Sequence, residues 1–245
     1  MLRTVEHDGV SDPVAIEEPL EIRVDGEPIA VTMRTPGADE ELALGFLLGE
    51  RLIDGPRSVG PTADLAANVI EVEGPLARPV KARRFYTTSS CGVCGKGALE
   101  EVAVAAPALA PGPRVKRALL ADLPERLAQP AFERSGGLHA TGLFDADGEL
   151  VCTREDVGRH NAMDKVVGWA LGEGRVPLGD FLLCVSGRVA FELVQKAAVA
   201  GCAVLVGVGA PTSLAIELAR DRGMTLCGFA RGGTVNVYVD AGRVA

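Results

Sequence analysis

The sequence predicts an α/β protein whose N-terminal part is α+β, and three observations support this fold class. Residues 181–239 alternate short apolar strands with helices, an order typical of a parallel sheet covered by helices. Aromatic residues make up only 4% of the chain while Val, Ala, Leu and Gly are plentiful, which suits helices packed on strands. Residues 106–116 contain three prolines and a glycine and interrupt any regular pattern. We therefore predict a smaller α+β domain over residues 1–110 and an α/β domain over residues 111–245.

The N-terminal part begins with a predicted hairpin over residues 21–34, where alternating apolar side chains flank Asp25 and Gly26. Asp39 can cap the helix that follows, and acidic residues in its first turn suit the positive end of the helix dipole. The remaining elements are predicted as a helix over residues 40–53, short strands near residues 69–73 and 81–87, and a helix over residues 98–105.

The C-terminal part carries the clearer pattern, because strand-like and helix-like segments follow one another along the chain. Asp147 and Gly148 mark the turn of a second hairpin, and Pro211 suits the first turn of a helix. The predicted strands cover residues 138–144, 149–154, 181–186, 203–208, 224–229 and 235–240. The predicted helices cover residues 117–129, 156–170, 189–200 and 211–222.

Composition and charge argue against several classes of protein. Apolar residues make up 47% of the 245 residues, which is enough for a substantial core and argues against a disordered chain. The formal net charge of −8 argues against a general nucleic-acid-binding protein, whose affinity comes from Lys and Arg. The N-terminal residues lack the apolar core of a signal peptide, and no apolar stretch is long enough to span a bilayer. We expect a soluble, cytoplasmic protein.

The motif CGVC is the strongest chemical signal in the chain. Cys91 and Cys94 stand two residues apart, which is typical of a redox pair, half of a metal site or a sulfur carrier. Gly92 and Gly95 let the backbone turn tightly and expose the sulfur atoms. The charge of Lys96 and the start of a following helix both favour a thiolate, which is the reactive form of cysteine.

Zinc binding, redox chemistry and simple packing are alternative roles for this cysteine pair. Structural zinc normally needs four ligands, and the sequence holds no second close cysteine pair. A thioredoxin-like redox pair is expected within a βαβ unit, whereas this pair follows an α+β segment. The pair can also be two small apolar residues that share a turn. The remaining cysteines lie in or beside apolar strands and are interpreted as core residues: Cys152, Cys184, Cys202 and Cys227.

Three loops follow the three strands that are predicted to run parallel, at residues 186–188, 207–213 and 231–234. Parallel strands bring such loops to one carboxyl edge, where open α/β sheets bind ligands. Arg188 and Arg231 can hold phosphate, and two of the loops lead into helix N-termini, which favour anions. The sequence thus offers a phosphate or nucleotide pocket without a P-loop or Rossmann fingerprint. The alternative is that the glycines serve tight turns, the arginines are merely solvated, and Thr212 or Ser213 simply caps a helix.

The segment REDVGRHNAMDK at residues 154–165 is dense in polar side chains. Arg154, Arg159 and His160 are candidates to contact an anionic ligand or to tune a thiol. The commoner case is an ordinary helix with a solvated, charged face, so His160 is not assigned as a catalytic base.

Six blocks of sequence resemble the FdhD family of formate dehydrogenase accessory sulfurtransferases. They are SSCGVCGK at residues 89–96, HATGLFDADG at 139–148, REDVGRHNAMDK at 154–165, SGRVAFELVQKA at 186–197, APTSLAIELA at 210–219 and GFARGG at 228–233. A single CxxC is weak evidence of kinship, whereas six blocks in the same order are specific. The chain differs from the family at Ala190 and Gly209, where the family often carries Ser.

The resemblance implies a sulfurtransferase that takes sulfur from a cysteine desulfurase as a cysteine persulfide. The implied acceptor is the molybdenum (or tungsten) bis-guanine-dinucleotide cofactor, which the catalytic subunit of formate dehydrogenase then receives. The cofactor is thus a bound substrate, GDP-like nucleotides can occupy its site, and no structural metal is expected. The resemblance also implies a homodimer and a three-layer α/β/α, cytidine-deaminase-like fold for residues 111–245, although the zinc signature of the deaminases is absent.

The resemblance also assigns roles to particular residues. Cys91 is implied to carry the persulfide, with Cys94 as its helper. The implied cofactor-binding segment comprises Phe229, Ala230, Arg231, Gly232, Gly233 and Thr234. Arg188, from the predicted phosphate pocket, is added to this set. Two alternative functions remain: a thioredoxin-like thiol–disulfide oxidoreductase, and a non-enzymatic chaperone that binds guanine nucleotides or the cofactor.

Overall fold

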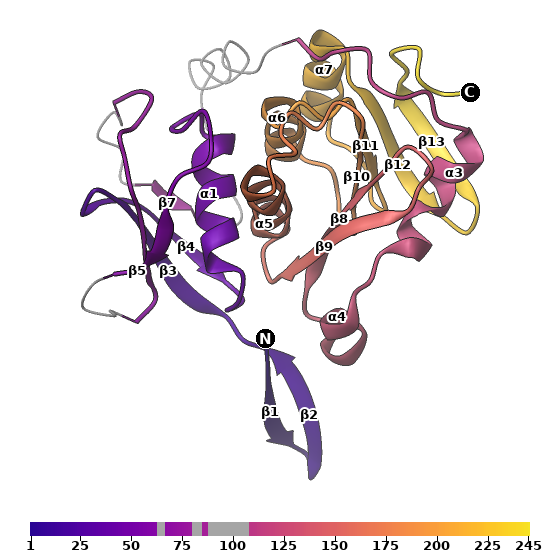
Figure 1. The fold of residues 1–245 in the computed structure, drawn as a ribbon. Helices are drawn as coiled ribbons and strands as arrows, with labels where there is room; N and C mark the ends of the chain where they lie inside the picture. The colour runs from indigo at the N-terminus through magenta and orange to yellow at the C-terminus, as the bar shows by residue number, and fades with distance from the viewer. Residues whose placement is uncertain (63–66, 80–84, 88–107) are drawn as a thin grey trace. The chain divides into compact units, whose positions relative to one another are not determined.

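The computed structural model describes residues 1–62, 67–79, 85–87 and 108–245 (Figure 1). The predicted helix over residues 98–105, the CGVC motif and most of the strand predicted at residues 81–87 lie outside these residues. The chain divides into two compact units that interleave along the sequence. Unit 1 comprises Met1–Cys94, Gln129–His139 and Glu155–Gly174, and unit 2 comprises Gly95–Ala128, Ala140–Arg154 and Arg175–Ala245. The division into domains at residue 110 stays a prediction.

Unit 1 contains a five-stranded sheet with the strand order β5-β6-β3-β4-β7. Its centre is the predicted hairpin, in which Val24 pairs with Glu27 across a turn of Asp25 and Gly26. Both turn residues have positive φ angles (49° and 81°), as a tight two-residue hairpin turn requires. The strands are β3 (Glu18–Val24), β4 (Glu27–Arg34), β5 (Val59–Pro61), β6 (Val69–Val72) and β7 (Phe85–Thr87). Strand β6 matches the prediction, whereas β5 was not predicted.

Helix α1 (Asp39–Gly49) covers the first part of the predicted helix over residues 40–53. The helix ends early because Arg51 takes a left-handed conformation with φ of 53°, which turns the chain. Leu52 and Ile53 are nevertheless buried, so the apolar pattern predicted burial correctly and the end of the helix incorrectly. The N-cap is Ala38, which makes no side-chain hydrogen bond to the helix, so the predicted capping role of Asp39 is wrong.

Helix α5 (Arg159–Gly172) packs against α1 within unit 1. The two backbones approach each other at glycines. A Cβ atom on Gly45 would lie 1.8 Å from the carbonyl oxygen of Asp164, and one on Gly168 would lie 1.8 Å from that of Glu41. Only glycine fits at both positions, because real Cβ atoms do not come this close to other atoms. Residues 129–139 and 155–174 therefore complete unit 1 together with the N-terminal part of the chain.

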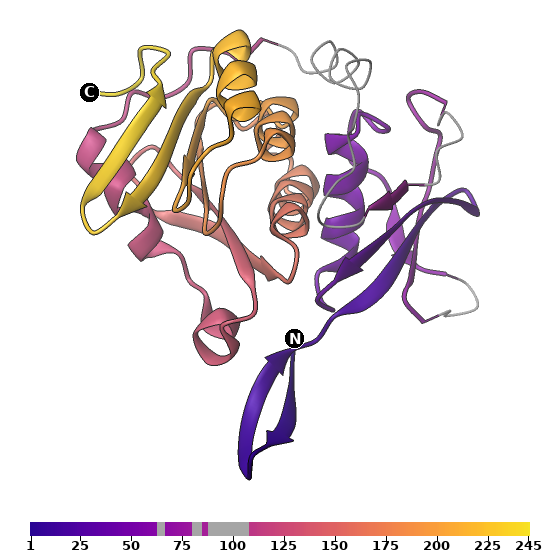
Figure 2. The same cartoon turned by 180° about the vertical axis from the view of Figure 1, so that it is seen from behind.

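Two further elements of unit 1 were not predicted from the sequence. Strands β1 (Leu2–His7) and β2 (Val10–Ala15) form a two-stranded antiparallel hairpin, drawn in indigo beside the N-terminus in Figure 2. The short helix α4 (Pro130–Ser135) begins with a proline, which suits the first position of a helix. Helix α4 contacts β2.

Unit 2 is built on the predicted sheet, a mixed one in the order β13-β12-β11-β10-β8-β9. Strands β10, β11 and β12 run parallel, as the alternation of strands and helices predicts. Strands β8 and β13 run antiparallel to their neighbours β10 and β12. The strands are β8 (His139–Phe144), β9 (Leu150–Asp156), β10 (Leu182–Val185), β11 (Val204–Gly207), β12 (Thr225–Arg231) and β13 (Thr234–Val239).

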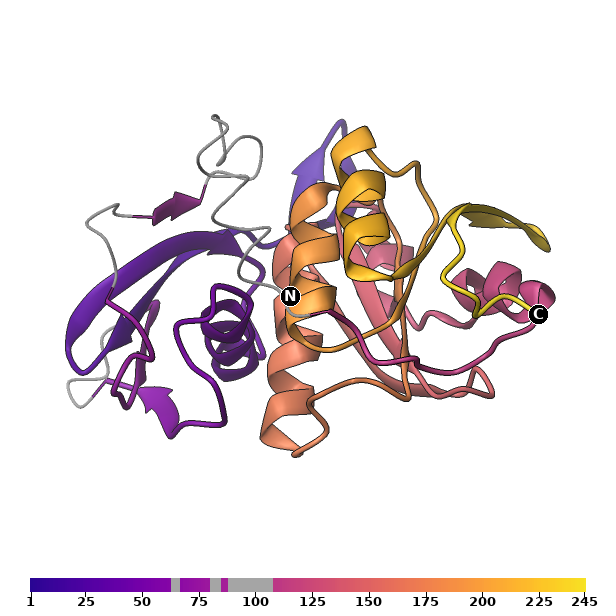
Figure 3. The same ribbon diagram turned by 90° about the horizontal axis from the view of Figure 1, so that it is seen from above.

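Helices cover both faces of this sheet. Helices α6 (Phe191–Val199) and α7 (Ser213–Arg222) lie together on one face, as the view in Figure 3 shows. Helix α3 (Arg117–Asp122) and a 3-10 helix, η1 (Leu123–Arg126), cover the other face. The sequence predicted one α-helix over residues 117–129. Pro124 explains the change, because it has no N–H to continue the α-helical hydrogen bonding.

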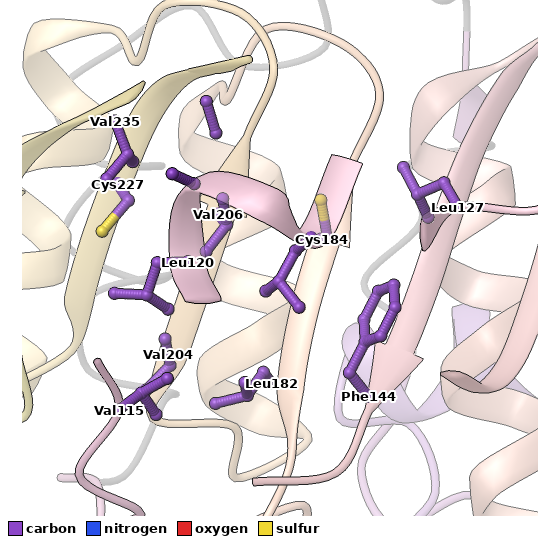
Figure 4. Packing of buried hydrophobic residues seen from close by; sticks show 13 residues of the cluster. Val115, Leu120, Leu127, Phe144, Leu182, Cys184, Val204, Val206, Cys227 and Val235 are labelled. Atoms are coloured by element: carbon purple, nitrogen blue, oxygen red, sulfur yellow. The ribbon is translucent and has the colours of Figure 1, made fainter. Parts of the chain in front are cut away.

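The core beneath α3 and η1 joins them to the sheet (Figure 4). Leu120 and Leu123 from the helical side pack on Cys184, Val206 and other strand residues, all of them buried. This packing fixes η1 against the strands that end at the carboxyl edge of the sheet. No helix among the described residues is long and apolar enough to cross a membrane.

Candidate functional site

The loops that follow β10, β11 and β12 lie side by side at the carboxyl edge of the sheet in unit 2. The Gly209 N–H donates to the carbonyl oxygen of Gly187 (3.0 Å), and the Val189 N–H donates to that of Ala210 (3.1 Å). The third loop joins them because the Phe229 N–H donates to the carbonyl oxygen of Gly209 (3.2 Å). The parallel order of the strands predicted this meeting of three loops correctly.

Glycines allow this close packing of backbone on backbone. A Cβ atom on Gly209 would lie 2.9 Å from the Cα atom of Arg188, and one on Gly207 would lie 2.4 Å from Cγ2 of Val189. A Cβ atom on Gly228 would lie 2.7 Å from Cδ of Pro211. These glycines have a structural reason of their own, so their presence is no evidence for a ligand.

The segment from Phe229 to Thr234 forms the end of strand β12 and the tip of the β12–β13 hairpin. The pairing of the two strands shifts between Gly228 and Arg231, and within this irregularity Phe229 takes a φ angle of 53°. Its aromatic side chain is 39% exposed, whereas the methyl group of Ala230 is fully buried in the core. The fold thus holds an aromatic ring at the surface of the carboxyl edge, at a backbone conformation that bulky residues rarely adopt.

The hairpin tip is a two-residue turn of Gly232 and Gly233, with φ angles of 54° and 70°. Arg231 pairs with Thr234 across this turn, and the Thr234 hydroxyl donates to the Arg231 carbonyl oxygen (2.9 Å). The turn needs glycine because both of its residues have positive φ angles. The Gly232 N–H donates to Oε1 of Glu125 (2.9 Å), a residue that no sequence motif had indicated.

The side chains of two arginines at this edge have no ion pair or hydrogen bond with any residue that the structure describes. Both Arg188 and Arg231 are exposed. Other arginines of unit 2 hold backbone carbonyl groups: Arg117 donates to Val235 (2.8 Å), and Arg126 donates to Gly148 (2.8 Å). Guanidinium groups without such structural bonds are available to an anionic ligand, and they suit phosphate in particular.

The sequence also predicted that the start of helix α7 contributes to the pocket, but here Thr212 serves the helix itself. The Thr212 hydroxyl oxygen accepts a hydrogen bond from the Ala215 N–H (3.3 Å) and so caps the helix. For Thr212, the alternative interpretation as a simple helix cap is correct.

The motif REDVGRHNAMDK builds a buried polar network in unit 1 instead of a charged outer face. The Asp156 carboxylate accepts hydrogen bonds from the backbone N–H groups of Thr35 (3.0 Å) and Gly158 (2.8 Å). It also accepts from the Asn161 side chain (3.0 Å) and forms an ion pair with Lys165 (2.7 Å). The helix predicted from residue 156 therefore begins only at Arg159, because the Asp156 side chain bonds the turn that precedes it.

The neighbouring acid of this motif also serves the fold. The carboxylate of Glu155 accepts hydrogen bonds from the N–H groups of Ala131 (3.0 Å) and Phe132 (2.6 Å), at the start of helix α4. Asp164 and Lys165 are buried, so the interpretation of this segment as a helix with a solvated charged face is wrong. The side chains of Arg154, Arg159 and His160 are partly exposed, and their predicted contact with a ligand stays a prediction.

The cysteines that the structure describes are buried, as the sequence predicted, and none forms a disulfide. Burial raises the pKa of the Cys202 thiol to about 11, against the lowering effect of hydrogen bonds to backbone groups. Burial likewise raises the pKa of Cys227 to about 12 and that of Cys184 further still. These thiols stay protonated at neutral pH and are poor nucleophiles. Cys91 and Cys94 lie outside the described residues.

Comparison with known proteins identifies similar sequences and similar solved structures. The model of the FdhD/NarQ family matches residues 15–245. "Sulfur carrier protein FdhD" of Nocardia farcinica is 49% identical over 246 residues, covering 95% of this chain and 88% of that protein. The Mycobacterium tuberculosis protein of the same name is 48% identical over 254 residues, covering 95% and 92%. The crystal structure of a protein assigned as a formate dehydrogenase accessory protein, from Desulfotalea psychrophila, has a TM-score of 0.79 at 25% identity and covers 100% of this chain and 98% of its own.

Proposed function

Because this chain belongs to the FdhD/NarQ family, we propose that it carries sulfur as a persulfide on Cys91 and delivers it to the cofactor of a formate dehydrogenase. The donor in this proposal is a cysteine desulfurase, and the acceptor is a molybdenum or tungsten bis-guanine-dinucleotide cofactor. The relatives named as sulfur carrier proteins support the sulfur chemistry. The accessory protein from Desulfotalea psychrophila supports the link to formate dehydrogenase. We further propose that the protein acts as a homodimer.

The observation that carries the choice of the CGVC pair is the state of the remaining cysteines, and the family resemblance implies that Cys91, the first of the pair, carries the persulfide. Cys184, Cys202 and Cys227 are buried thiols with raised pKa values, and Cys152 is buried as well. None of these four side chains is exposed to a partner protein. The CGVC motif has the opposite surroundings in the sequence, with glycines and a lysine that favour an exposed thiolate.

The proposed transfer conserves atoms and electrons at each step. The Cys91 thiolate attacks the outer sulfur of the donor persulfide, whose S–S bond breaks and leaves the donor as a thiolate. A new S–S bond then holds that sulfur on Cys91. On delivery this bond breaks in turn, its electron pair returns to Cys91, and the acceptor metal supplies two electrons to the sulfur that it binds.

The carboxyl edge of unit 2 supplies the proposed acceptor site. The acceptor carries two guanine dinucleotides and therefore several phosphate groups. Arg188 and Arg231 are exposed guanidinium groups without a bond to any other described residue, and Phe229 presents an exposed aromatic face. These groups suit phosphate and a planar base, respectively. Ala230 can contribute only backbone groups, because its methyl group is buried.

Mass spectrometry of the intact protein tests the sulfur-carrier function. After incubation with a cysteine desulfurase and L-cysteine, the unreduced protein should gain the mass of one sulfur atom. Cys91→Ser should abolish this gain, whereas Cys94→Ser and the control Cys152→Ala should keep it. If Cys91→Ser gains sulfur as the unsubstituted protein does, Cys91 is not the carrier.

The same variants separate the alternatives. A thiol–disulfide oxidoreductase needs both Cys91 and Cys94, so either substitution should abolish its activity. A non-enzymatic chaperone needs neither, so Cys91→Ala should still support full formate dehydrogenase activity.

A further inference from the structure

Glu125 and Gly232 are 107 residues apart in the sequence and meet at the proposed acceptor site. Oε1 of Glu125 accepts a hydrogen bond of 2.9 Å from the Gly232 N–H, at the tip of the β12–β13 hairpin. Arg231, the neighbour of Gly232, is exposed and has no ion pair with any described residue. The carboxylate therefore bonds the neutral backbone amide of Gly232, although the preceding residue, Arg231, carries a positive charge.

The turn leaves this amide without a partner in the strand pairing. Arg231 and Thr234 are the last residues to pair, so the Gly232 N–H points out of the ladder. Backbone N–H groups in turns are common partners of phosphate and carboxylate oxygens. The Gly232 amide is thus an anion-binding group, and in this structure its anion is a side chain of the protein itself.

The element that presents Glu125 is firmly fixed to unit 2. Leu123, two residues earlier, is fully buried in the core beneath η1. Arg126, the next residue, donates a hydrogen bond of 2.8 Å to the carbonyl oxygen of Gly148. Between these two anchors Glu125 and Gly232 are both exposed, so their hydrogen bond forms in contact with water and is of modest strength. An incoming anion can replace such a bond without disturbing the core.

We propose that the Glu125 carboxylate occupies the Gly232 N–H in place of a phosphate group of the ligand. It blocks this amide until the ligand phosphate displaces the carboxylate. This inference rests on the proposed function, since it takes the carboxyl edge as the site of a guanine dinucleotide. Glu125 thereby lowers the affinity of the empty site for free phosphates and nucleotides. A ligand with further contacts, to Arg188 and Arg231 for example, overcomes this competition. Glu125 is a specificity-determining residue rather than a catalytic one.

Calorimetric titration with GDP tests the competition directly. Glu125→Gln keeps the shape of the side chain and removes its charge. Because a hydrogen bond to an ionised group is about twice as strong as one to a neutral group, the amide competes less for a neutral side chain. The affinity for GDP should therefore rise about threefold to tenfold. Glu125→Asp keeps the charge but is too short to reach the amide, and it should also tighten binding. Guanosine, which has no phosphate, should bind all of these proteins equally.

Asp122→Asn is the matched control for charge. Asp122 is exposed in the preceding turn of the same helical segment, and its side chain makes no hydrogen bond to the described residues of the hairpin. Its substitution removes the same charge and should leave the affinity for GDP nearly unchanged. If Asp122→Asn tightens binding as much as Glu125→Gln does, or if Glu125→Asp has no effect, general electrostatic repulsion explains the result and the competition for the amide is refuted.

The outcomes also separate this inference from the proposed function. GDP binding by the unsubstituted protein that weakens in Arg231→Ala, without any change in Glu125→Gln, supports the acceptor site and overturns the role of Glu125. The absence of GDP binding in the unsubstituted protein and in every variant overturns both the acceptor site and the role of Glu125. In ¹⁵N-labelled protein, the Gly232 amide signal should shift when Glu125 is substituted and again when GDP is added.

Discussion

Lys165 and Asp156 form an ion pair of 2.7 Å in which both side chains are inaccessible to solvent, at 1% and 0% exposure. The pair fastens helix α5 to the end of strand β9. The Lys165 ammonium also donates to the carbonyl oxygen of Thr35 (2.8 Å), and so links both elements to the segment that follows β4. Asp156 and Lys165 of the REDVGRHNAMDK motif therefore serve first to hold unit 1 together.

Replacing Lys165 by Met should strongly destabilise the protein. The change leaves the Asp156 carboxylate buried without its counterion, and breaking a buried pair from one side costs about 3–5 kcal/mol. Urea denaturation measures this loss in the free energy of unfolding. Lys116→Met, at an exposed lysine, is the matched control and should change stability little. A loss in Lys165→Met as small as that of the control would contradict the structural role of the pair.

Gly45→Ala should also destabilise unit 1, for a steric reason. The added methyl group would overlap the backbone of Asp164, so helices α1 and α5 would have to separate. Overpacking of this kind typically costs about 1–3 kcal/mol. Gly172→Ala, at an open position of α5, should instead be neutral or stabilise slightly, because alanine favours a helix more than glycine does. Thermal unfolding of the two variants distinguishes a close helix contact from a general intolerance of alanine.

Buried Cys202 should make stability depend on alkaline pH. Its pKa is raised from 9.0 to about 11 in the folded protein, so above pH 9 the unfolded state loses a proton that the folded state keeps. The free energy of unfolding should therefore be unaffected by this thiol below pH 9, and fall by about 1.4 kcal/mol per pH unit between pH 9 and 11. Comparison with Cys202→Ala isolates this contribution, since the variant should lose it and keep the contributions of buried Cys184 and Cys227. Equal slopes in both proteins would refute the assigned cause.

Arg231→Ala and Arg188→Ala should each weaken GDP binding by about tenfold, because a hydrogen-bonded ion pair with phosphate is lost. The binding should also weaken with added salt, and less steeply in the variants. Arg220→Ala tests the specificity of this effect. Arg220 is an exposed arginine in the last turn of α7, outside the carboxyl-edge loops, and its loss should not change the affinity. An equal effect of all three substitutions would point to net charge rather than to a site.

The sequence predicted most elements because their signals are local. The Asp25-Gly26 turn and the apolar strands around Cys184 and Val206 depend on neighbouring residues alone. Some errors arose where distant residues decide, and others where a short local signal was missed. The start of α5 at Arg159 depends on the bonds of Asp156 to Thr35, and these residues lie 121 positions apart. Helix α4 was missed because its six residues carry too little periodicity to be recognised.

The sequence predicted the place of the candidate site but not all of its residues. Parallel strand order was enough to bring the loops of Gly187, Gly209 and Phe229 together, without knowledge of any contact. Glu125 could not be found in this way, since nothing in the sequence around it indicates that it meets Gly232. Local patterns also gave no means to separate exposed Phe229 from buried Ala230, because an irregular strand pairing decides which of them faces the core.

The interleaving of the two units has a consequence for how the polypeptide is made. Helix α1 emerges from the ribosome early, but its packing partner α5 is complete only when Gly172 has been synthesised. Until then the face of α1 that packs on α5 has no native cover, and a fragment that stops at residue 110 never acquires one. Most of unit 1 is translated early, but the unit cannot finish folding until residue 174 has been synthesised. The nascent chain therefore exposes apolar surface of the kind that chaperones shield.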